Sequence, residues 1–519
     1  MASADSIRTN RESWIKGGGA VVIALVVAKL LFHLYTGRHY GYFRDELYYL
    51  ACSQHLAWGY VDQAPLIVLI AKITRVLLGD SLAAIRLIPA LAGAALVALT
   101  GLMARELGGG RFAQGFAAFT VLVAPAFLGL DNLFTMNAFE PLFWMGCAYV
   151  LIRMVNTGDR RLWLWFGVLA GIGLENKHSM LIFGFAIVAG LLLTGERKLL
   201  LSPWLWIAGA VAFLIFLPNL IWNIQHHFPF LELQANIRRN HRNVDLPPLR
   251  FLGEEIVTML PLSLPVWAAG LWFYLAAPKG RHFRFLGYAF VISAVIIMTL
   301  DPRTYYLFPG FPLLFAGGAV LWESWLTRPG LGWLKIAYPA LMLVLAVIAA
   351  PFAAPVLPVP TFLRYAEAIH YQQPKIENVN LGPLPQLFAD QFGWEEMAAA
   401  VAQVYRKIPA DLRQNTAIFA QNYGEAGAVD FFGPKYGLPR ATSGHQSYFL
   451  WGPRDYTGES VIVMGSDRQA RLEALFASVE NAGTVYHPYS MPYEHFDLFY
   501  CRGLKQPLAE LWPQLKNWN

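Results

Sequence analysis

Charged side chains are scarce in this chain. Asp, Glu, Lys and Arg together make up 14% of its 519 residues, whereas roughly 25% is usual for a soluble protein. Hydrophobic residues reach 56%. This composition excludes a soluble globular protein as a description of the whole chain, and it predicts a polytopic α-helical membrane protein.

Cysteine pairs and ordered glycine motifs are also lacking. Cys52, Cys147 and Cys501 show no Cys-x-x-Cys spacing and cannot all pair, although Cys52 and Cys501 could meet. The spacing therefore gives no metal signature and no disulfide framework. The glycines of residues 424–433 match neither a dinucleotide fingerprint nor a phosphate loop, which argues against a soluble-nucleotide site. The net charge of +6 comes from Lys and Arg scattered at the ends of apolar runs, so no nucleic-acid partner is expected.

Long apolar runs are abundant. The first follows a polar segment that contains Arg8, Arg11 and Lys16. A signal peptide is an alternative, but no small-residue cleavage site follows, and a run of ~18 residues is long enough to span a bilayer. We therefore expect an uncleaved first helix. About eleven runs approach spanning length: residues 17–35, 81–105, 112–130, 134–155, 162–173, 179–194, 204–222, 251–276, 285–300, 305–325 and 334–350.

The distribution of positive charge predicts the orientation of these spans. Basic residues gather at alternate ends of successive runs: Arg105, Arg111, Arg153, Arg160, Arg161, Arg197, Lys198, Lys279, Arg281, Arg284, Arg328 and Lys335. By the positive-inside rule, these loops and the N-terminus are cytoplasmic. Residues 37–80, 131–140, 223–250 and 301–306 then lie outside, as does Lys177. An odd number of spans places the C-terminal part outside as well. We expect a multi-pass protein of the inner or plasma membrane.

The character of the chain changes after residue 350. A proline-rich stretch, residues 351–360, ends the apolar part, and the residues beyond it mix charged and apolar positions as a soluble domain does. We therefore predict a transmembrane domain of residues 1–350 and a small extracytoplasmic α/β domain of residues 351–519. Within the latter, we expect helices at 387–406 and at 467–481, the second opened by Ser466 or Asp467. Short strands are expected at 417–420, 461–464, 484–486 and 497–501.

Acidic residues cluster in the first outer loop, residues 37–80. Within residues 42–66 lie Asp45, Glu46 and Asp62, in a protein that otherwise avoids charge. At the membrane boundary, a carboxylate meets water, lipid headgroups and polar substrates, so it can accept a proton there. Helix capping, or ion pairs with neighbouring basic residues, would explain the same acids without a catalytic role. We interpret this loop as catalytic.

A cationic cluster breaks the charge bias on the outer side. Residues 223–250 contain His226, Arg238, Arg239 and Arg242 among other basic residues. A solvated loop facing anionic headgroups is one explanation, but the planar fork of Arg is matched to phosphate oxygens, and we favour a phosphate site. Lys177, at the outer end of a span, is a second cation of this kind, for which simple snorkelling is the alternative.

Several short motifs carry a resemblance to a known family. They are Asp45-Glu46, Gly59-Tyr60-Val61-Asp62-Gln63-Ala64-Pro65-Leu66, Thr135-Met136-Asn137, Lys177, Leu217-Pro218-Asn219-Leu220-Ile221-Trp222, and Arg303-Thr304-Tyr305-Tyr306 with Pro309 and Pro312. In this order they resemble the dolichyl-phosphate-mannose protein mannosyltransferases and lipid A aminoarabinose transferases, which are integral membrane glycosyltransferases of the GT-C fold. The similarity runs to about residue 350. Tyr423-Gly424-Glu425-Ala426 resembles the extracytoplasmic domain of bacterial members.

The resemblance implies an inverting transfer of a sugar from a polyprenyl-phosphate-linked donor to a hydroxyl of an extracytoplasmic lipid, glycan or protein. Such a reaction needs a base for the acceptor and positive charge for the departing phosphate. Asp45 matches the family's base, Glu46 orients it or exchanges roles with it, and Asp62 is the alternative base. Glycosidase-like paired carboxylates are not required. The expected cations for the donor phosphate are Lys177, Arg238, Arg239 and Arg242, and further candidate site residues are Tyr42, Glu140, His226, Arg303 and Tyr305.

Some features leave alternatives open. Ala64-Pro65 stands where some relatives carry Pro-Pro, so the acceptor is undetermined. Asp45, Asp62 and Glu140 are hard oxygen ligands that could converge on a divalent cation, but no spacing requires one, and we expect no cofactor. A lipid or sugar transporter or flippase is the competing class. It usually places charges near the bilayer midplane and shows internal repeats, whereas here the ionisable residues gather at one interface.

Overall fold

The computed structural model describes residues 18–244, 246–300, 303–465 and 469–519. The chain forms two compact units. The helical unit comprises Met1–His39, Ala83–Ile221 and Asp245–Leu357, and the mixed unit comprises Tyr40–Leu82, Trp222–Val244 and Pro358–Asn519. The compact units thus do not follow a single cut at residue 350, because two segments from the first 350 residues fold with the C-terminal part. The expected basic residues Arg8, Arg11 and Lys16, the expected helix cap at Ser466 or Asp467, and Asp301 lie outside the described residues.

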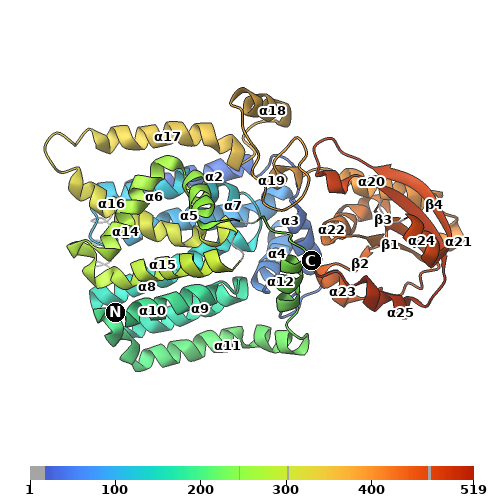
Figure 1. Ribbon diagram of the computed structural model, residues 1–519, viewed down its shortest axis with the longest axis horizontal. Helices are drawn as coiled ribbons and strands as arrows, with labels where there is room; N and C mark the ends of the chain where they lie inside the picture. Colours follow the sequence, from blue (N-terminus) through green and yellow to red (C-terminus); the bar gives the residue numbers. More distant parts are fainter. Residues whose placement is uncertain (1–17, 245, 301–302, 466–468) are drawn as a thin grey trace. The chain divides into compact units, whose positions relative to one another are not determined.

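The helical unit is built from apolar helices whose axes run roughly parallel to one another (Figure 1). Among its packed pairs are α14 with α16, α10 with α15, and α8 with α9. Its helices are α2 (Ala20–Thr36), α5 (Leu82–Glu106), α6 (Arg111–Val123), α7 (Pro125–Leu130), α8 (Met136–Thr157), α9 (Trp163–Asn176), α10 (Met180–Leu192), α11 (Pro203–Gln225, which ends in the mixed unit), α13 (Pro248–Thr258), α14 (Leu264–Leu275), α15 (Arg284–Thr299), α16 (Phe311–Trp325) and α17 (Leu334–Ala353).

Length and composition identify the spanning segments among the described residues. Six are long and apolar enough to cross a membrane: Leu82–Glu106, Met136–Thr157, Pro203–Gln225, Pro278–Thr299, Thr304–Trp325 and Leu334–Ala353. Two bent pairs, Met180–Leu192 with Gly195–Leu201 and Pro248–Thr258 with Pro261–Leu275, bring the number to eight if each is one span. The helices α2 and α6 are shorter but apolar. The protein is therefore a multi-pass helical membrane protein, as predicted.

A carboxylate from α16 fixes where α6 begins. Glu323 accepts hydrogen bonds from the backbone N–H groups of Gly110 (2.6 Å), Phe112 (2.9 Å) and Ala113 (3.1 Å). The first N–H groups of a helix have no partner within it, and the helix dipole favours negative charge at that end. Glu323 satisfies both requirements, so one side chain joins two helices far apart in the sequence.

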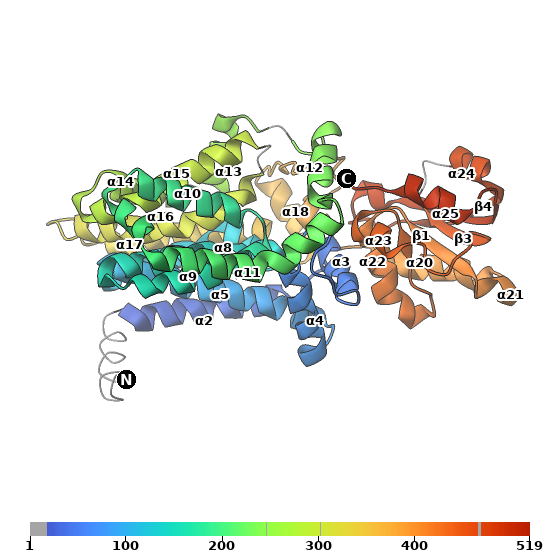
Figure 2. The same cartoon turned by 90° about the horizontal axis from the view of Figure 1, so that it is seen from below.

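The mixed unit contains a five-stranded sheet in the order β2-β1-β3-β5-β4. The strands are β1 (Thr416–Ala420), β2 (Thr442–Ser443), β3 (Ser460–Met464), β4 (Phe476–Val485) and β5 (Phe496–Leu504). Strand β1 is parallel to β2 and β3, whereas β5 is antiparallel to β3 and β4. Helix α20 (Trp394–Lys407) covers one face, and α24 (Gln469–Leu475) and α25 (Leu508–Leu511) lie on the other (Figure 2). This sheet confirms the predicted small α/β part of the chain.

The remaining helices of the mixed unit come from three separate parts of the chain. They are α3 (Arg44–Cys52), α4 (Leu66–Leu78), α12 (Pro229–Arg239), α18 (Val359–Ala368), α19 (Gln386–Ala389), α21 (Ala410–Arg413), α22 (Tyr423–Phe432) and α23 (Gln446–Trp451). Helix α22 packs against α3 and α20. The expected helix at 387–406 is thus two helices, α19 and α20.

The helix predicted at 467–481 is wrong beyond Leu475. Phe476 begins β4, which pairs with β5 from Phe476 opposite Leu504 to Val485 opposite Phe496. The apolar residues of this stretch fit a helical period, but β5 needs a partner on its second edge, and a ladder of backbone hydrogen bonds outweighs local preference. The predicted strand 484–486 is the end of the same long strand.

A buried ion pair joins α2 to the end of α7. Lys29 Nζ lies 2.7 Å from Asp131 Oδ2, both side chains are essentially unexposed, and the ammonium also donates to the carbonyl oxygen of Phe127 (2.9 Å). Each charge makes the other tolerable in an apolar surrounding, and removing one partner leaves an uncompensated charge.

We expect Asp131→Asn to destabilise the protein by about 3–5 kcal/mol because it strands the Lys29 charge. The double variant with Lys29→Met should recover most of this loss, since neither charge then remains. Thermal unfolding in detergent measures both effects. If the single variant unfolds at the wild-type temperature, the pair has no structural importance.

Candidate functional site

Helix α3 carries two of the predicted acids in its first turn. Phe43 precedes the helix in an extended conformation, and its N–H donates to the Glu46 carboxylate at 2.8 Å. Glu46 is fully buried. A carboxylate three residues into a helix that turns back in this way satisfies a donor that the helix cannot, and it also complements the dipole. Glu46 thus holds the start of α3, a geometry that fits an orienting role better than contact with substrate.

Asp45 is the more accessible acid of this turn, with a side chain 29% exposed. Its Oδ1 accepts a hydrogen bond from the hydroxyl of Tyr423 at 2.8 Å, and the Nε of Arg44 lies 3.8 Å from the same oxygen. Burial raises the pKa of the Tyr423 phenol well above its usual value, so this hydroxyl keeps its proton and donates. Asp45 is therefore held at one oxygen while its side chain reaches solvent.

Asp62 lies in the same unit and is held in a parallel way. Its Oδ1 accepts from the Tyr48 hydroxyl at 3.0 Å. Burial raises the pKa of Asp62 to about 7, the Tyr48 hydrogen bond opposes this, and the negative charge of Asp45 adds to it. Two acids thus sit close enough to influence each other, and one of them changes charge near neutral pH.

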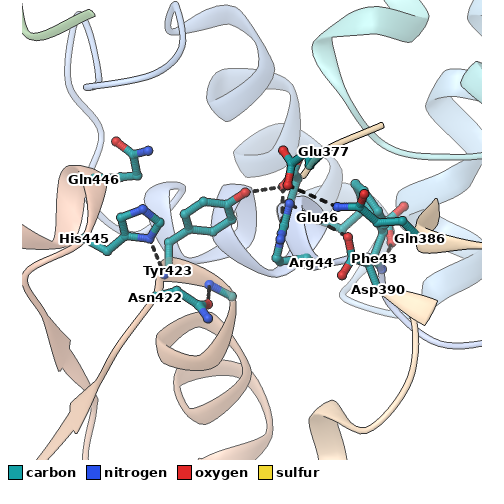
Figure 3. A network of polar contacts seen from close by, with 12 residues as sticks. Phe43, Arg44, Glu46, Glu377, Gln386, Asp390, Asn422, Tyr423, His445 and Gln446 are labelled. Atoms are coloured by element: carbon teal, nitrogen blue, oxygen red, sulfur yellow. Dashed lines mark hydrogen bonds and ion pairs between the residues drawn. The ribbon is translucent and has the colours of Figure 1, made fainter. Parts of the chain in front are cut away.

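The two tyrosines belong to one aromatic stack. The ring of Tyr48 lies 4.7 Å from that of Tyr423, and Tyr423 stacks on His445 at 5.0 Å with the planes 14° apart. Burial lowers the pKa of His445 to about 3, so the ring is neutral. Its Nδ1 accepts from the Tyr423 N–H (3.1 Å), and its Nε2 then donates to the carbonyl oxygen of Asn519 (3.2 Å). Figure 3 shows Tyr423 between His445 on one side and Arg44 on the other.

Arg44 anchors the beginning of α3 to the C-terminal part of the chain. Its N–H donates to the carbonyl oxygen of Asp390 (3.0 Å), and its guanidinium donates to the Tyr493 hydroxyl (2.8 Å), which in turn donates to Asp390 Oδ1 (2.9 Å). Burial raises the pKa of Asp390 to about 6, although Arg44 opposes the shift. This network fixes the residue next to Asp45; Figure 3 shows Arg44 and Asp390 within it.

A pair of buried carboxyl groups lies beside the same network. The side-chain amide of Asn422 donates to Glu425 (2.7 Å) and to Glu494 (3.2 Å). Burial raises the pKa of Glu494 to about 8, and burial together with the charge of Glu494 raises that of Glu425. Two such groups around one amide do not both ionise easily, so a proton is retained there at neutral pH.

The predicted cations of residues 223–250 differ in their surroundings. Arg238 and Arg239 are exposed in the last turn of α12. Arg242 is half-buried; it pairs with Glu377 at 3.1 Å and donates to the carbonyl oxygen of Asn519 at 2.6 Å. His226 stacks on Trp222 with ring centroids 4.1 Å apart. Three of the predicted phosphate ligands thus share a unit with Asp45 and Asp62.

Lys177 belongs to the helical unit, at the end of α9. Its Nζ donates to Asn137 Oδ1 (2.9 Å) and to Glu140 Oε2 (2.6 Å), and it lies over the rings of Tyr305 (5.2 Å) and Tyr306 (4.6 Å). Ser179 donates to the second oxygen of Glu140, and Arg303 to the hydroxyl of Tyr305 at 3.4 Å. The predicted site residues of the helical unit therefore lie together: Glu140 and Tyr305 contact the ammonium group of Lys177, and Arg303 contacts Tyr305.

Tyr42, a further candidate site residue, lies in the same unit as the acids. Its hydroxyl donates to the carbonyl oxygen of Asp80, and its ring contacts those of Phe431 and Phe432. Among the described residues, no three His, Cys, Asp or Glu side chains are placed to hold a metal ion.

Sequence reasoning missed the residues that hold the acids: Tyr48, Tyr423, His445, Asp390 and Tyr493. Tyr48 lies three residues from Asp45, so its position in the loop was a usable signal. The others are distant in the sequence, and of these only Tyr423 lies in a motif that the resemblance singles out, Tyr423-Gly424-Glu425-Ala426.

Comparison with known proteins gives a family match over part of the chain and one fold. Residues 62–222 match the family model of dolichyl-phosphate-mannose-protein mannosyltransferases. A search of curated protein sequences finds no match.

The structure of ArnT from Cupriavidus metallidurans bound to undecaprenyl phosphate superposes with a TM-score of 0.58 at 14% identity, covering 92% of this chain and 97% of that one. The apo form gives 0.58 at 15% identity with the same coverage. The Archaeoglobus fulgidus oligosaccharyltransferase with a tethered acceptor peptide gives 0.49 at 14%, covering 80% and 63%. The chain has the GT-C fold of membrane glycosyltransferases.

The buried carboxyl pair predicts how stability depends on pH. The pKa of Glu494 in the folded protein, about 8, lies above its ordinary value of 4.5, so folding favours the protonated form. Its contribution is fully present below pH 4.5 and is lost as the pH rises through 8. Glu494→Gln stays neutral, so its melting temperature should exceed that of the wild type by several degrees at pH 8–9 but not at pH 4.5. Equal melting temperatures at both pH values would contradict the buried proton.

Proposed function

Because the chain has the GT-C fold and resembles the mannosyltransferase family in residues 62–222, we propose that it is a membrane glycosyltransferase. It moves a sugar from a polyprenyl-phosphate-linked donor to a hydroxyl of an extracytoplasmic lipid, glycan or protein, with inversion. The observation that carries this proposal is a pair of acids within the mixed unit, Asp45 and Asp62, each held at one oxygen by a buried tyrosine. Positive-inside charge supports a cytoplasmic N-terminus and an extracytoplasmic sheet.

Asp45 is the base in this proposal. Its side chain is accessible, and its Oδ1 is occupied by the Tyr423 hydroxyl, so Oδ2 is the oxygen that takes the proton of the acceptor hydroxyl. The acceptor oxygen then forms its bond to the anomeric carbon as the bond from that carbon to the donor phosphate breaks. One acid suffices for this direct displacement, because the leaving phosphate needs no proton if its charge is stabilised.

Asp62 is the alternative base. A general base works best when its pKa lies near the operating pH, and Asp62 meets that condition with a pKa of about 7. Its hydrogen bond with Tyr48 and its half-buried position fit a supporting acid equally well. The two assignments differ in how the rate should depend on pH.

The departing polyprenyl phosphate requires cations. Arg238 and Arg239 are exposed, and their planar guanidinium groups are matched to phosphate oxygens. Arg242 is half-buried and pairs with Glu377. Lys177 is paired with Glu140, so an incoming phosphate must compete with that carboxylate. Arg238 and Arg239 are therefore the cations that we assign to the donor phosphate first, because their exposure leaves them accessible to a lipid headgroup.

We expect Asp45→Asn to reduce turnover by about 10²–10⁴-fold, because it keeps the shape of the side chain and removes its basicity. Transfer of radiolabelled sugar by purified protein measures it, and thermal unfolding controls for folding. Asp62→Asn should retain far more activity. If instead Asp62 is the base, wild-type kcat/KM will fall about tenfold per pH unit below about pH 7, and Asp62→Asn will be the inactive variant. Movement of the lipid donor across vesicles without any transfer would favour a flippase.

We expect Arg238→Lys and Arg239→Lys each to raise KM for the lipid donor, on the order of tenfold, because a point charge cannot make the two parallel hydrogen bonds of Arg. Arg364→Lys is the matched control: it is also an exposed arginine on a helix of the mixed unit, with no expected role. An unchanged KM for the lipid donor in both Arg238→Lys and Arg239→Lys would exclude a phosphate site at the end of α12.

A further inference from the structure

The segment of residues 422–427 has a geometry that the reaction as described does not use. It opens α22, and that helix packs against α3, whose first turn carries Asp45. The Asn422 side chain accepts from the N–H groups of Gly424 (2.8 Å) and Glu425 (3.0 Å), which caps α22. The Glu425 carboxylate accepts from the Gln421 N–H (2.8 Å). These hydrogen bonds hold the first turn of α22, which is the end of the helix that packs against the first turn of α3.

Two glycines set how closely the helices approach. A Cβ on Gly427 would stand 3.0 Å from the carbonyl carbon of Leu47, which is backbone of α3, and a Cβ on Gly424 would stand 2.5 Å from Cγ of Arg44. Real Cβ atoms rarely tolerate such distances. A side chain at 427 would press on the backbone of α3, and one at 424 would displace the Arg44 side chain. Both positions face the helix that carries Asp45, one beside the residue before it and one two residues after it.

The close approach of α22 to α3 brings the hydroxyl of Tyr423 to Asp45. Its backbone N–H is held by His445, its ring lies between those of Tyr48 and His445, and its hydroxyl reaches Asp45 at 2.8 Å. Further contacts tie the acidic loop to the C-terminal part: the Val61 N–H donates to the Ser447 hydroxyl (3.2 Å), and the Ser447 N–H donates to the Tyr48 hydroxyl (3.1 Å). Asp45 is thus tied to the C-terminal part directly by Tyr423, and Asp62 is tied to it through Tyr48 and Ser447.

We propose that residues 422–427 are a seat for the catalytic helix, and that Tyr423 is a positioning residue that orients the Asp45 carboxylate for proton transfer. This inference rests on the proposed function for its kinetic part. The hydroxyl occupies Oδ1, so Oδ2 alone faces the acceptor, and Tyr423 acts through Asp45 rather than on the sugar. The C-terminal part of the chain is then a component of the active site and not an accessory.

The first test compares Tyr423→Phe with the wild type and with Asp45→Asn. Phe keeps the stacked ring and removes only the hydroxyl. We expect kcat to fall roughly 10- to 100-fold with KM unchanged, since a hydrogen bond to a charged group is lost. In the Asp45→Asn background the same change should cost less than about twofold, because no ionised carboxylate remains to be oriented. A purely structural role would cost the same factor in both backgrounds and would overturn the proposal.

Tyr448→Phe is the matched control. Tyr448 is a buried tyrosine of the same unit whose hydroxyl donates to Asp430 at 2.9 Å, and Phe keeps its ring stacked on that of Tyr48. We expect near wild-type kcat for this variant. A loss equal to that of Tyr423→Phe would overturn the specific role of Tyr423.

The seat itself is tested without any activity. Hydrogen–deuterium exchange of the wild-type protein in detergent gives the exchange rate of the amides of Arg44–Cys52. Gly427→Ala should speed this exchange about tenfold, because the new methyl group meets α3 backbone. Gly253→Ala, at a helical glycine with nothing within 4 Å, is the control and should leave α3 unchanged. Unaltered exchange in Gly427→Ala would overturn the seat.

The two levels of the proposal fail differently. If the wild-type protein transfers no sugar, the proposed function fails, and the exchange experiment still decides whether the seat exists. If the wild type is active, Asp45→Asn is impaired and Tyr423→Phe behaves as the wild type, then the role of Tyr423 fails and the function stands.

Discussion

The hydrogen bond from Tyr423 to Asp45 depends on a close approach of two helices that are almost 400 residues apart in the sequence. A carboxylate with one fixed oxygen presents the other in a defined direction, which is what a general base needs. The surrounding elements serve this contact: Glu46 begins α3, Asn422 begins α22, and glycines remove the side chains that would separate the two helices.

This arrangement buries several acids of the mixed unit. Asp62, Asp390 and Glu494 all have raised pKa values because each is withdrawn from water. Such groups are retained where a polar network must have a single geometry, since each hydrogen bond in it has few alternatives at low dielectric. The positive charge of Arg44 opposes the pKa shifts of Asp390 and Glu494. The Tyr48 hydrogen bond and the charge of Arg242 oppose the pKa shift of Asp62.

The helical unit also contains buried charges, and in two places a lysine is paired with one acid. Lys177 is enclosed by Glu140, Asn137 and two tyrosine rings, and Lys29 is enclosed by Asp131 and a carbonyl oxygen. An ammonium in an apolar surrounding needs a counter-charge within contact distance. Both lysines therefore come with an acid from another helix, and the same pairing that stabilises the fold keeps a cation near Tyr305 and Tyr306.

The sequence by itself determined the class of the protein, the apolar helices and the residues that stand out as charged. Composition and run length decide membrane insertion locally, so the long helices lie where the apolar runs predicted them, and Asp45 and Asp62 were visible because charge is rare. Only the tertiary structure decided which groups hold those acids. Tyr423 and Tyr493 reach α3, and His445 holds Tyr423, through long-range packing that has no period in the sequence. The same reason explains the misjudged helix after Leu475: its neighbour β5, and not its own residues, made Phe476–Val485 a strand.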